Sequence, residues 1–339
     1  MGSIFQHESR FPFTYYPTGW FFAALSDDVP KGSLLNIKFC GQDVVLYRTE
    51  SEILRAIDPF CPHLGAHLGH GGRVVGEELE CPFHGWRFST SGKCVDVPYS
   101  DSTPPQKSGR GCLKIWHVKE DFGVVYIWYD QLKRSPFFEI KFDERLYSGE
   151  FWSEPKVFKW VIDTHIQELV ENSVDTAHFT KVHERTYKNI LPNVDSYTFD
   201  EHFFQILTTS EFDVLGKKYP TQVSVRCDGL GVMHVESIFR EGMGLHLIMA
   251  MKPIGPNRVE LRAIISHVKS KNPMINLFQR LFAVNFFPNE VEHDLKIWKY
   301  KNYVEKPVLS KDDGPIMPFR KWCKQFYPAE TLIGVGEEG

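Results

Sequence analysis

Several features that would assign this chain to a special class are missing from its sequence. No apolar run follows a basic start at the N-terminus, so we expect no secretory signal. The apolar stretches are short, or are interrupted by polar residues as in 274–288, so we expect no membrane span. Acidic residues number 43 against 39 lysines and arginines, and the net charge of −4 does not favour nucleic acid or anionic lipid as a partner.

The cysteines also lack a disulfide pattern. Seven are present, and only Cys61 and Cys81 fall within a motif. The others do not show the spacing of a disulfide-stapled fold, so we expect a reducing compartment and a cytoplasmic protein. The 339 residues, of which 42% are hydrophobic and 24% are charged, are enough for about two ordinary globular domains.

The strongest local pattern pairs cysteine with histidine twice. One residue separates Cys61 from His63, two separate Cys81 from His84, and seventeen lie between the two pairs. Structural zinc sites usually place about two to four residues between their first two ligands. The pattern fits better with a Rieske [2Fe–2S] centre, in which thiolates hold one iron and imidazoles hold the other. A structural zinc knuckle is the alternative.

A second group of polar residues lies in the middle of the chain. Asn172, Asp175 and His178 are spaced by three residues, and His183 follows five residues later. The apolar pattern predicts a helix from residue 164 to about residue 177, which would place the first three on one face. A spacing of five does not fit an α-helix, so we expect the helix to end or bend before His183. Taken singly, Asp175 and His183 could equally be ordinary surface residues.

Short β segments with turns fill the first part of the chain, and longer strands fill the second. We predict a β domain over residues 16–135 and a second domain over residues 150–330, joined by a polar connector. The two Cys/His pairs would lie on loops at one end of the first domain. Most connections in the second domain are short, so we expect an antiparallel sheet with two helices and an α+β fold class. The predicted strands are 34–39, 44–48, 53–57, 112–118 and 124–129, then 156–162, 197–212, 221–227, 232–239, 244–251 and 258–267.

These patterns resemble those of one known family. Residues 61–88 resemble the Rieske domain of the Rieske non-heme iron oxygenases, and residues 172–183 resemble that family's motif Asn-x-x-Asp-x-x-His-x4-His. Residues 58–69, 97–100 and 297–303 are similar to the branch that holds 3-ketosteroid 9α-hydroxylase and cholesterol 7-desaturase. The resemblance implies an N-terminal all-β Rieske domain followed by a helix-grip catalytic domain, in which a curved antiparallel sheet grips a long helix.

The resemblance also implies two iron sites. It assigns the [2Fe–2S] cluster to the four residues of the Cys/His pairs, and Fe(II) to His178, His183 and an aspartate of a late helix. A 2-His-1-carboxylate triad leaves positions on iron open for O₂ and substrate. We predict a helix from residue 289 to about residue 303, with Asp294 on its apolar face. A carboxylate there is costly unless it is paired or metal-bound, so Asp294 is our candidate, and Glu290, one turn earlier, is the rival.

The implied activity is that of a terminal oxygenase, an oxidoreductase. A ferredoxin and/or an NAD(P)H-dependent reductase would supply electrons through the Rieske centre to Fe(II), where O₂ is used to hydroxylate or desaturate a C–H bond. The implied substrate is a bulky apolar molecule, steroid-like or a natural product. Asp175 would link the Rieske histidine of one subunit to the iron-ligand histidine of the next, which requires a closed ring, usually a homotrimer.

Several alternatives stay open at this point. The same iron can serve N-oxygenation of an aromatic amine, as in aminopyrrolnitrin oxygenase. A Rieske electron carrier would need only the first domain. The chlorophyll-catabolic oxygenases carry a C-terminal Cys-x-x-Cys, whereas Cys323 stands alone. Bulky apolar residues of the second half are assigned mainly to core packing, with an apolar pocket as the alternative. These residues are Phe203, Phe204, Phe239, Leu245, Leu247 and Met249.

Overall fold

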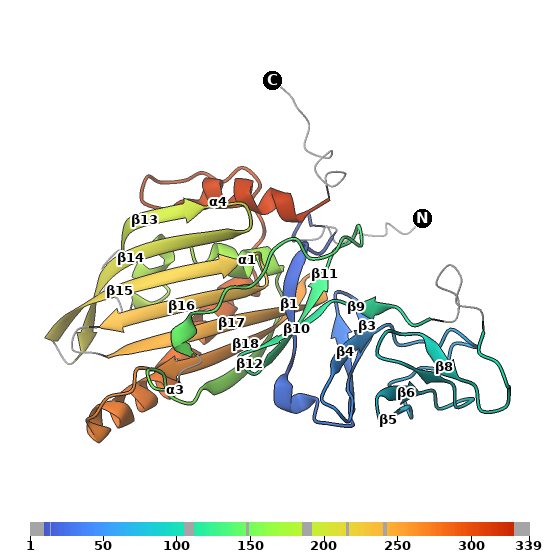
Figure 1. The fold of residues 1–339 in the computed structure, drawn as a ribbon. Coiled ribbons are helices and arrows are strands. Elements are labelled where there is room, and N and C mark those ends of the chain that lie inside the picture. The colour runs from blue at the N-terminus through green and yellow to red at the C-terminus, as the bar shows by residue number, and fades with distance from the viewer. Residues whose placement is uncertain are drawn as a thin grey trace, which may run out of the picture. The chain divides into compact units, whose positions relative to one another are not determined.

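The computed structural model describes residues 10–13, 15–104, 112–146, 149–184, 192–214, 217–239 and 243–328. The chain forms two compact units (Figure 1). One unit comprises residues 20–137, and the other comprises the described residues before and after that range. No helix within the described ranges combines the length and the apolar composition that a membrane crossing needs.

The first unit is built from three small sheets, with strand orders β1-β11-β10, β2-β3-β4-β9 and β5-β6-β7-β8. The chain makes a tight hairpin after residue 39, in which Cys40 and Gly41 both have positive φ, a conformation that the short connection requires. The strands are β1 (Gly19–Leu25), β2 (Leu34–Phe39), β3 (Gln42–Arg48), β4 (Leu54–Ile57), β5 (Arg73–Val75), β6 (Glu78–Glu80), β7 (Arg87–Phe88), β8 (Cys94–Asp96), β9 (Ile115–Trp116), β10 (Val118–Asp121) and β11 (Val124–Tyr129).

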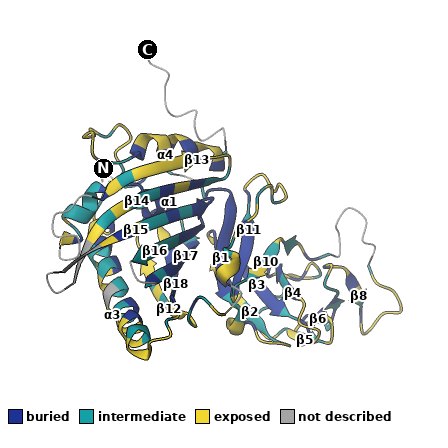
Figure 2. Cartoon of the chain, turned by 60° about the vertical axis from the view of Figure 1, so that its left-hand side comes forward, coloured by how far each residue is buried: buried dark blue, intermediate teal, exposed yellow. Residues whose placement is uncertain are grey.

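The second unit contains a seven-stranded sheet with the order β12-β18-β17-β16-β15-β14-β13, and every neighbouring pair is antiparallel. Burial is concentrated in the middle strands, whereas edge strand β13 is mostly exposed (Figure 2). The strands are β12 (Lys156–Ile162), β13 (Asn193–Phe199), β14 (Phe203–Val214), β15 (Lys217–Asp228), β16 (Val232–Phe239), β17 (Gly244–Gly255) and β18 (Arg258–His267). The predicted strand 197–212 is therefore two strands joined by a tight turn.

A long helix, α3 (Pro273–Trp298), lies along this sheet (Figure 1). Near its start, the Gln279 side chain accepts a hydrogen bond from the amide of Gly244 and donates one to the carbonyl of Val268, both at 2.9 Å. Further along, Phe282 packs against Phe239 of β16, and Phe287 packs against Trp160 of β12. A large antiparallel sheet that holds one long helix confirms the predicted α+β, helix-grip architecture.

The predicted start of the late helix is wrong. We placed it at residue 289, after a proline, but α3 begins at Pro273, where the Asn272 side chain caps the amide of Met274. Pro288 lies inside the helix, and the lost backbone hydrogen bond is tolerated because residues on both sides of it are packed: Phe287 contacts Trp160, and Val291 is buried. The predicted cap at Asn289 is therefore an interior position.

The predicted helix from residue 164 to about 177 is also wrong in extent. The helix α1 spans only Ile166–Glu171, and the ring of His165, not Thr164, caps it by accepting from the amide of Gln167. A turn follows, and a 3₁₀ segment, η4 (Ala177–Thr180), carries the first motif histidine. Helix α4 (Ile316–Cys323) was not predicted. The remaining short 3₁₀ segments are η1 (Ser26–Asp28), η3 (Glu144–Leu146) and η6 (Lys324–Phe326).

Candidate metal centres

The two Cys/His pairs lie on two loops of the same design in the first unit. In the first loop, the amide of Cys61 donates to the carbonyl of Ala66 at 2.8 Å, and its carbonyl accepts from Gly65 at 2.9 Å. In the second loop, the amide of Cys81 donates to the carbonyl of Trp86 at 2.8 Å, and its carbonyl accepts from Gly85 at 3.1 Å. Gly65 and its counterpart Gly85 have φ of 79° and 70°, a conformation that side chains disfavour.

The donor set in these loops fits a metal cluster. Cys61 and Cys81 are buried in one core, and the rings of His63 and His84 are 4.6 Å apart. Burial, reinforced by the neighbouring Cys81, raises the pKa of the Cys61 thiol to about 12, so a thiolate here needs a cation. Within the part of the chain that the structure describes, the buried Nδ1 of His63 has no hydrogen-bond partner, as expected of a nitrogen reserved for metal.

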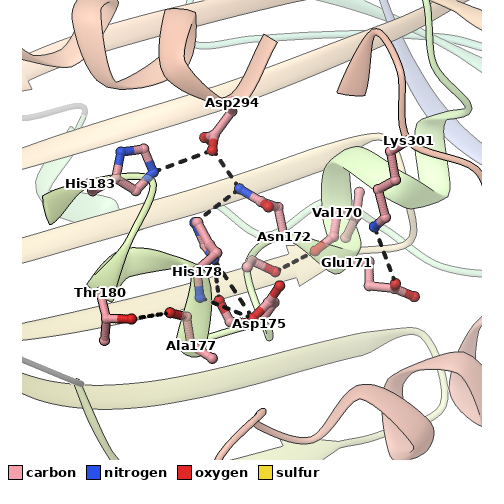
Figure 3. A network of polar contacts seen from close by, with 11 residues as sticks. Val170, Glu171, Asn172, Asp175, Ala177, His178, Thr180, His183, Asp294 and Lys301 are labelled. Atoms are coloured by element: carbon pink, nitrogen blue, oxygen red, sulfur yellow. Dashed lines mark hydrogen bonds and ion pairs between the residues drawn. The ribbon is translucent and has the colours of Figure 1, made fainter. Parts of the chain in front are cut away.

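The second motif and helix α3 bring three further candidate ligands together in the other unit. Side-chain donor atoms of His178, His183 and Asp294 all lie within 4.8 Å of one another. Nε2 of His183 is 3.3 Å from Oδ1 of Asp294 (Figure 3). The Asn172 amide donates to Oδ2 of Asp294 at 3.3 Å and lies 3.3 Å from Nε2 of His178. Two imidazoles and one carboxylate can hold a divalent iron and leave coordination positions free.

Asp175 orients His178 through its backbone. Nδ1 of His178 contacts the carbonyl of Asp175, and the amide of His178 donates to Oδ1 of Asp175 at 3.3 Å. The carboxylate stays 3.9 Å from Nδ1, and its side chain is 37% exposed. Burial lowers the pKa of His178, and nearby Asp294 only partly opposes it. A neutral ring with Nδ1 engaged presents Nε2 to the other ligand candidates.

His183 is contacted by carboxylates on both of its ring nitrogens. Oε2 of Glu290 lies 2.6 Å from Nδ1, whereas Asp294 lies next to Nε2. Burial favours the neutral ring, but the two carboxylates outweigh it and raise the pKa of His183 to about 9. Glu290 also forms a second possible metal-binding group with His183 and His293, which does not include His178. Glu290, the predicted rival carboxylate, therefore lies on the opposite edge of the His183 ring from Asp294 and His178.

A cavity adjoins the His178, His183 and Asp294 cluster. Its walls come from β14 to β18, α1 and α3, and they are mainly apolar. Four of the bulky residues that we assigned mainly to packing line this cavity, namely Phe239, Leu245, Leu247 and Met249. Phe203 and Phe204 do not line it, and Phe204 packs against Phe319 and Trp322.

Parts of the chain far from the motifs hold the ligand-bearing turn in place, and no local pattern indicated them. Arg320 of α4 forms a buried bidentate ion pair with Glu171 at the end of α1, with both distances 2.7 Å. Gly314, with φ of 81°, packs so closely that a Cβ there would lie 2.1 Å from the carbonyl oxygen of Val174. In the sequence, the only possible signal was the glycine itself, because glycine adopts positive φ and allows close backbone approach.

Comparison with known proteins matches both units. A Rieske [2Fe–2S] domain model matches residues 19–115, and a 3-ketosteroid 9α-hydroxylase C-terminal domain model matches residues 127–327. The Bombyx mori cholesterol 7-desaturase is 33% identical over 334 residues, which cover 94% of this chain and 71% of that protein. The oxygenase component of a 3-ketosteroid-9-alpha-monooxygenase from Rhodococcus rhodochrous is 25% identical over 324 residues, with 92% and 80% covered.

Solved structures share the fold. Dicamba monooxygenase bound to dicamba superposes with a TM-score of 0.73 at 17% identity, over 95% of this chain and 99% of that one. A Pseudomonas putida protein solved with caffeine gives 0.74 at 19% identity, over 90% and 89%. The predicted resemblance and fold class are confirmed, and the match over the second unit argues against a simple electron carrier.

A Rieske oxygenase component uses O₂ and receives electrons from a reductase or ferredoxin, and its cofactors are a [2Fe–2S] cluster and a non-heme iron. Both donor sets described above are present in this chain. The chain therefore belongs to the Rieske non-heme iron oxygenases, as an oxygenase component whose catalytic domain is of the 3-ketosteroid 9α-hydroxylase type.

Proposed function

We propose that this oxygenase hydroxylates or desaturates a C–H bond of a bulky, apolar, steroid-like substrate. The observation that carries the proposal is the mainly apolar cavity beside His178, His183 and Asp294. Such a cavity binds by burial of apolar surface, with few polar groups left to fix orientation. The names of the relatives support the same class, since they act on cholesterol or on a 3-ketosteroid.

We assign the cluster to Cys61, His63, Cys81 and His84, and Fe(II) to His178, His183 and Asp294. When bound, the cluster passes on single electrons, and the ferrous ion supplies O₂ activation at its open positions. The chain's own contribution is positional. The Asn172 amide holds the Asp294 carboxylate between the two histidines, and the carbonyl of Asp175 fixes the ring of His178. The apolar cavity walls keep bulk water away from the reacting C–H bond.

We further propose that the working form is a homotrimer with domains at about residues 16–135 and 150–330. Asp175 would join His178 to His84 of the partner subunit, and its partly exposed carboxylate is available for such a contact. Electrons would enter from a ferredoxin or an NAD(P)H-dependent reductase. The five cysteines outside the cluster motif form no disulfide in the described structure, which supports a reducing compartment, in keeping with the cytoplasm.

The cavity also supports a substrate orientation. Five hydroxyl side chains line it: Ser173 and Thr176 lie beside the ligand-bearing turn, and Thr208, Ser210 and Ser237 lie on strands of the sheet. Ser237 pairs with Leu245, and the next pair along the two strands is Ile238 with Gly244. The amide of Gly244 donates to the side chain of Gln279 on α3, so Ser237 lies near the Gln279 end of that helix. Asp294 follows Gln279 by fifteen positions along the helix, a rise of about 22 Å. A polar group of the substrate would bind the hydroxyl of Ser237 on the sheet, remote from the carbon that is oxidised.

The test is anaerobic binding of a panel of sterols and aromatic amines, followed by product analysis with O₂ and a surrogate reductase. We expect a sterol-type ligand to bind and to return a hydroxylated or desaturated product. Oxidation of an aromatic amine at nitrogen, with no sterol product, would instead support the aminopyrrolnitrin-type alternative and contradict the proposal.

A further inference from the structure

We propose that Glu290 is a positioning residue for the mononuclear metal site. Its carboxylate lies 2.6 Å from Nδ1 of His183 in an ion-pair contact, which leaves Nε2 of that ring as the metal-binding nitrogen. The inference rests on the proposed function, because it takes His178, His183 and Asp294 as the ligands. It adds a role for a residue outside that set.

The geometry divides the two nitrogens of His183 between two carboxylates. Glu290 and Asp294 are four residues apart on α3, so both project from one side of the helix. Oε2 of Glu290 lies 2.6 Å from Nδ1, and Oδ1 of Asp294 lies 3.3 Å from Nε2. The ring nitrogens point in different directions, so one metal ion cannot bind both. A metal-bound imidazole commonly donates its other N–H to a carboxylate.

The surroundings select which side holds the metal. On the Nε2 side, Asp294 is met by His178 and by the Asn172 amide, so the full triad converges there. On the Nδ1 side, the short contact with Glu290 is shielded from water, since the His183 side chain is 4% exposed and that of Glu290 is 16% exposed. An ion-pair contact that is shielded from water restricts the orientation of the ring more than an exposed one would, because the surrounding dielectric is low.

The cavity gives a second reason for the pairing. Glu290 is also one of the residues that line the mainly apolar cavity. An unpaired carboxylate at that wall would oppose an apolar ligand, because burying it without a partner is costly. The contact with His183 gives the Glu290 carboxylate a partner, so that it is not an unpaired charge at the cavity wall and instead supports a metal ligand.

The experiment measures metal affinity, with Co(II) as the probe because it is distinguishable from the cluster iron. Full-length protein with its [2Fe–2S] cluster is freed of mononuclear iron, dialysed against a Co(II) series, and analysed for bound cobalt. The variants are Glu290→Ala, Glu290→Gln, Asp294→Ala and a control, Glu292→Ala, which removes an exposed carboxylate from the same helix. Circular dichroism and thermal unfolding report whether the catalytic unit of each variant is folded, and the Rieske absorption spectrum reports whether the cluster is intact.

We expect Glu290→Ala to weaken Co(II) binding about 10- to 100-fold. Glu290→Gln, which keeps an acceptor and the shape, should weaken it less, and Glu292→Ala should not change it. Asp294→Ala should abolish binding. Wild-type affinity in both Glu290 variants would overturn the positioning role while leaving the ligand set intact. Binding that survives Asp294→Ala but not Glu290→Ala would instead overturn the ligand set and place the metal with Glu290 and His293.

Discussion

At the scale of single residues, the role proposed for Asp175 rests on its carboxylate and not on its backbone. Its carbonyl holds the ring of His178, whereas its carboxylate is partly exposed and 3.9 Å from that ring. Asp175→Asn keeps the backbone contact, so we expect normal iron content at both sites. We expect oxidation of the prereduced Rieske centre to slow by about 10- to 100-fold, because the charged link between imidazoles is lost. Stopped-flow absorbance with substrate and O₂ measures this rate.

Two results would contradict the role proposed for Asp175. Reoxidation at the wild-type rate would show that its carboxylate is an ordinary surface group. Loss of mononuclear iron would show that the carboxylate supports the metal site directly.

At the scale of elements, the local sequence pattern identified the motif residues but did not predict the bounds of the helices that position them. The spacing of Asp175 and His178 was visible in the sequence, yet the helix that we drew through them ends at Glu171. The cause is distant: Arg320 and Gly314 fix the end of α1 and the following turn. Likewise, the sequence predicted a helix start at Pro288, because the tertiary packing of its neighbours Phe287 and Val291 is not visible in sequence periodicity.

Gly314 offers a test of this support. An alanine there would be strained by the positive φ and would also meet the carbonyl of Val174. We expect Gly314→Ala to destabilise the catalytic unit by about 1–3 kcal/mol and to lower mononuclear iron occupancy while the Rieske absorption persists. Gly149 is the matched control, since its φ is also positive at 61° but a Cβ there meets nothing within 4 Å. Equal effects of the two variants on iron occupancy would contradict the claim that Gly314 supports the turn.

At the scale of the whole molecule, stability depends on histidines that are buried without charge. Burial lowers the pKa of His165 and of His234 to about 3, and that of His246 to about 4. His165 must stay neutral because its Nδ1 accepts the capping hydrogen bond of α1. His234 and His246 pack 5.7 Å apart on neighbouring strands, so protonation of both would also create repulsion.

The sign of the pH dependence follows from these shifts. An unfolded histidine has a pKa of about 6.5, so below that pH the unfolded chain binds protons that the folded chain does not. Stability is therefore full above about pH 6.5 and falls as the pH drops toward the folded values. Each such histidine costs about 2 kcal/mol between pH 7.5 and pH 5. His234→Phe should remove one of these contributions and make the pH dependence shallower, whereas His70→Gln, at an exposed position, should leave it unchanged. Urea unfolding at the two pH values measures the difference, and parallel losses in wild type and His234→Phe would show that His234 is not held neutral by the fold.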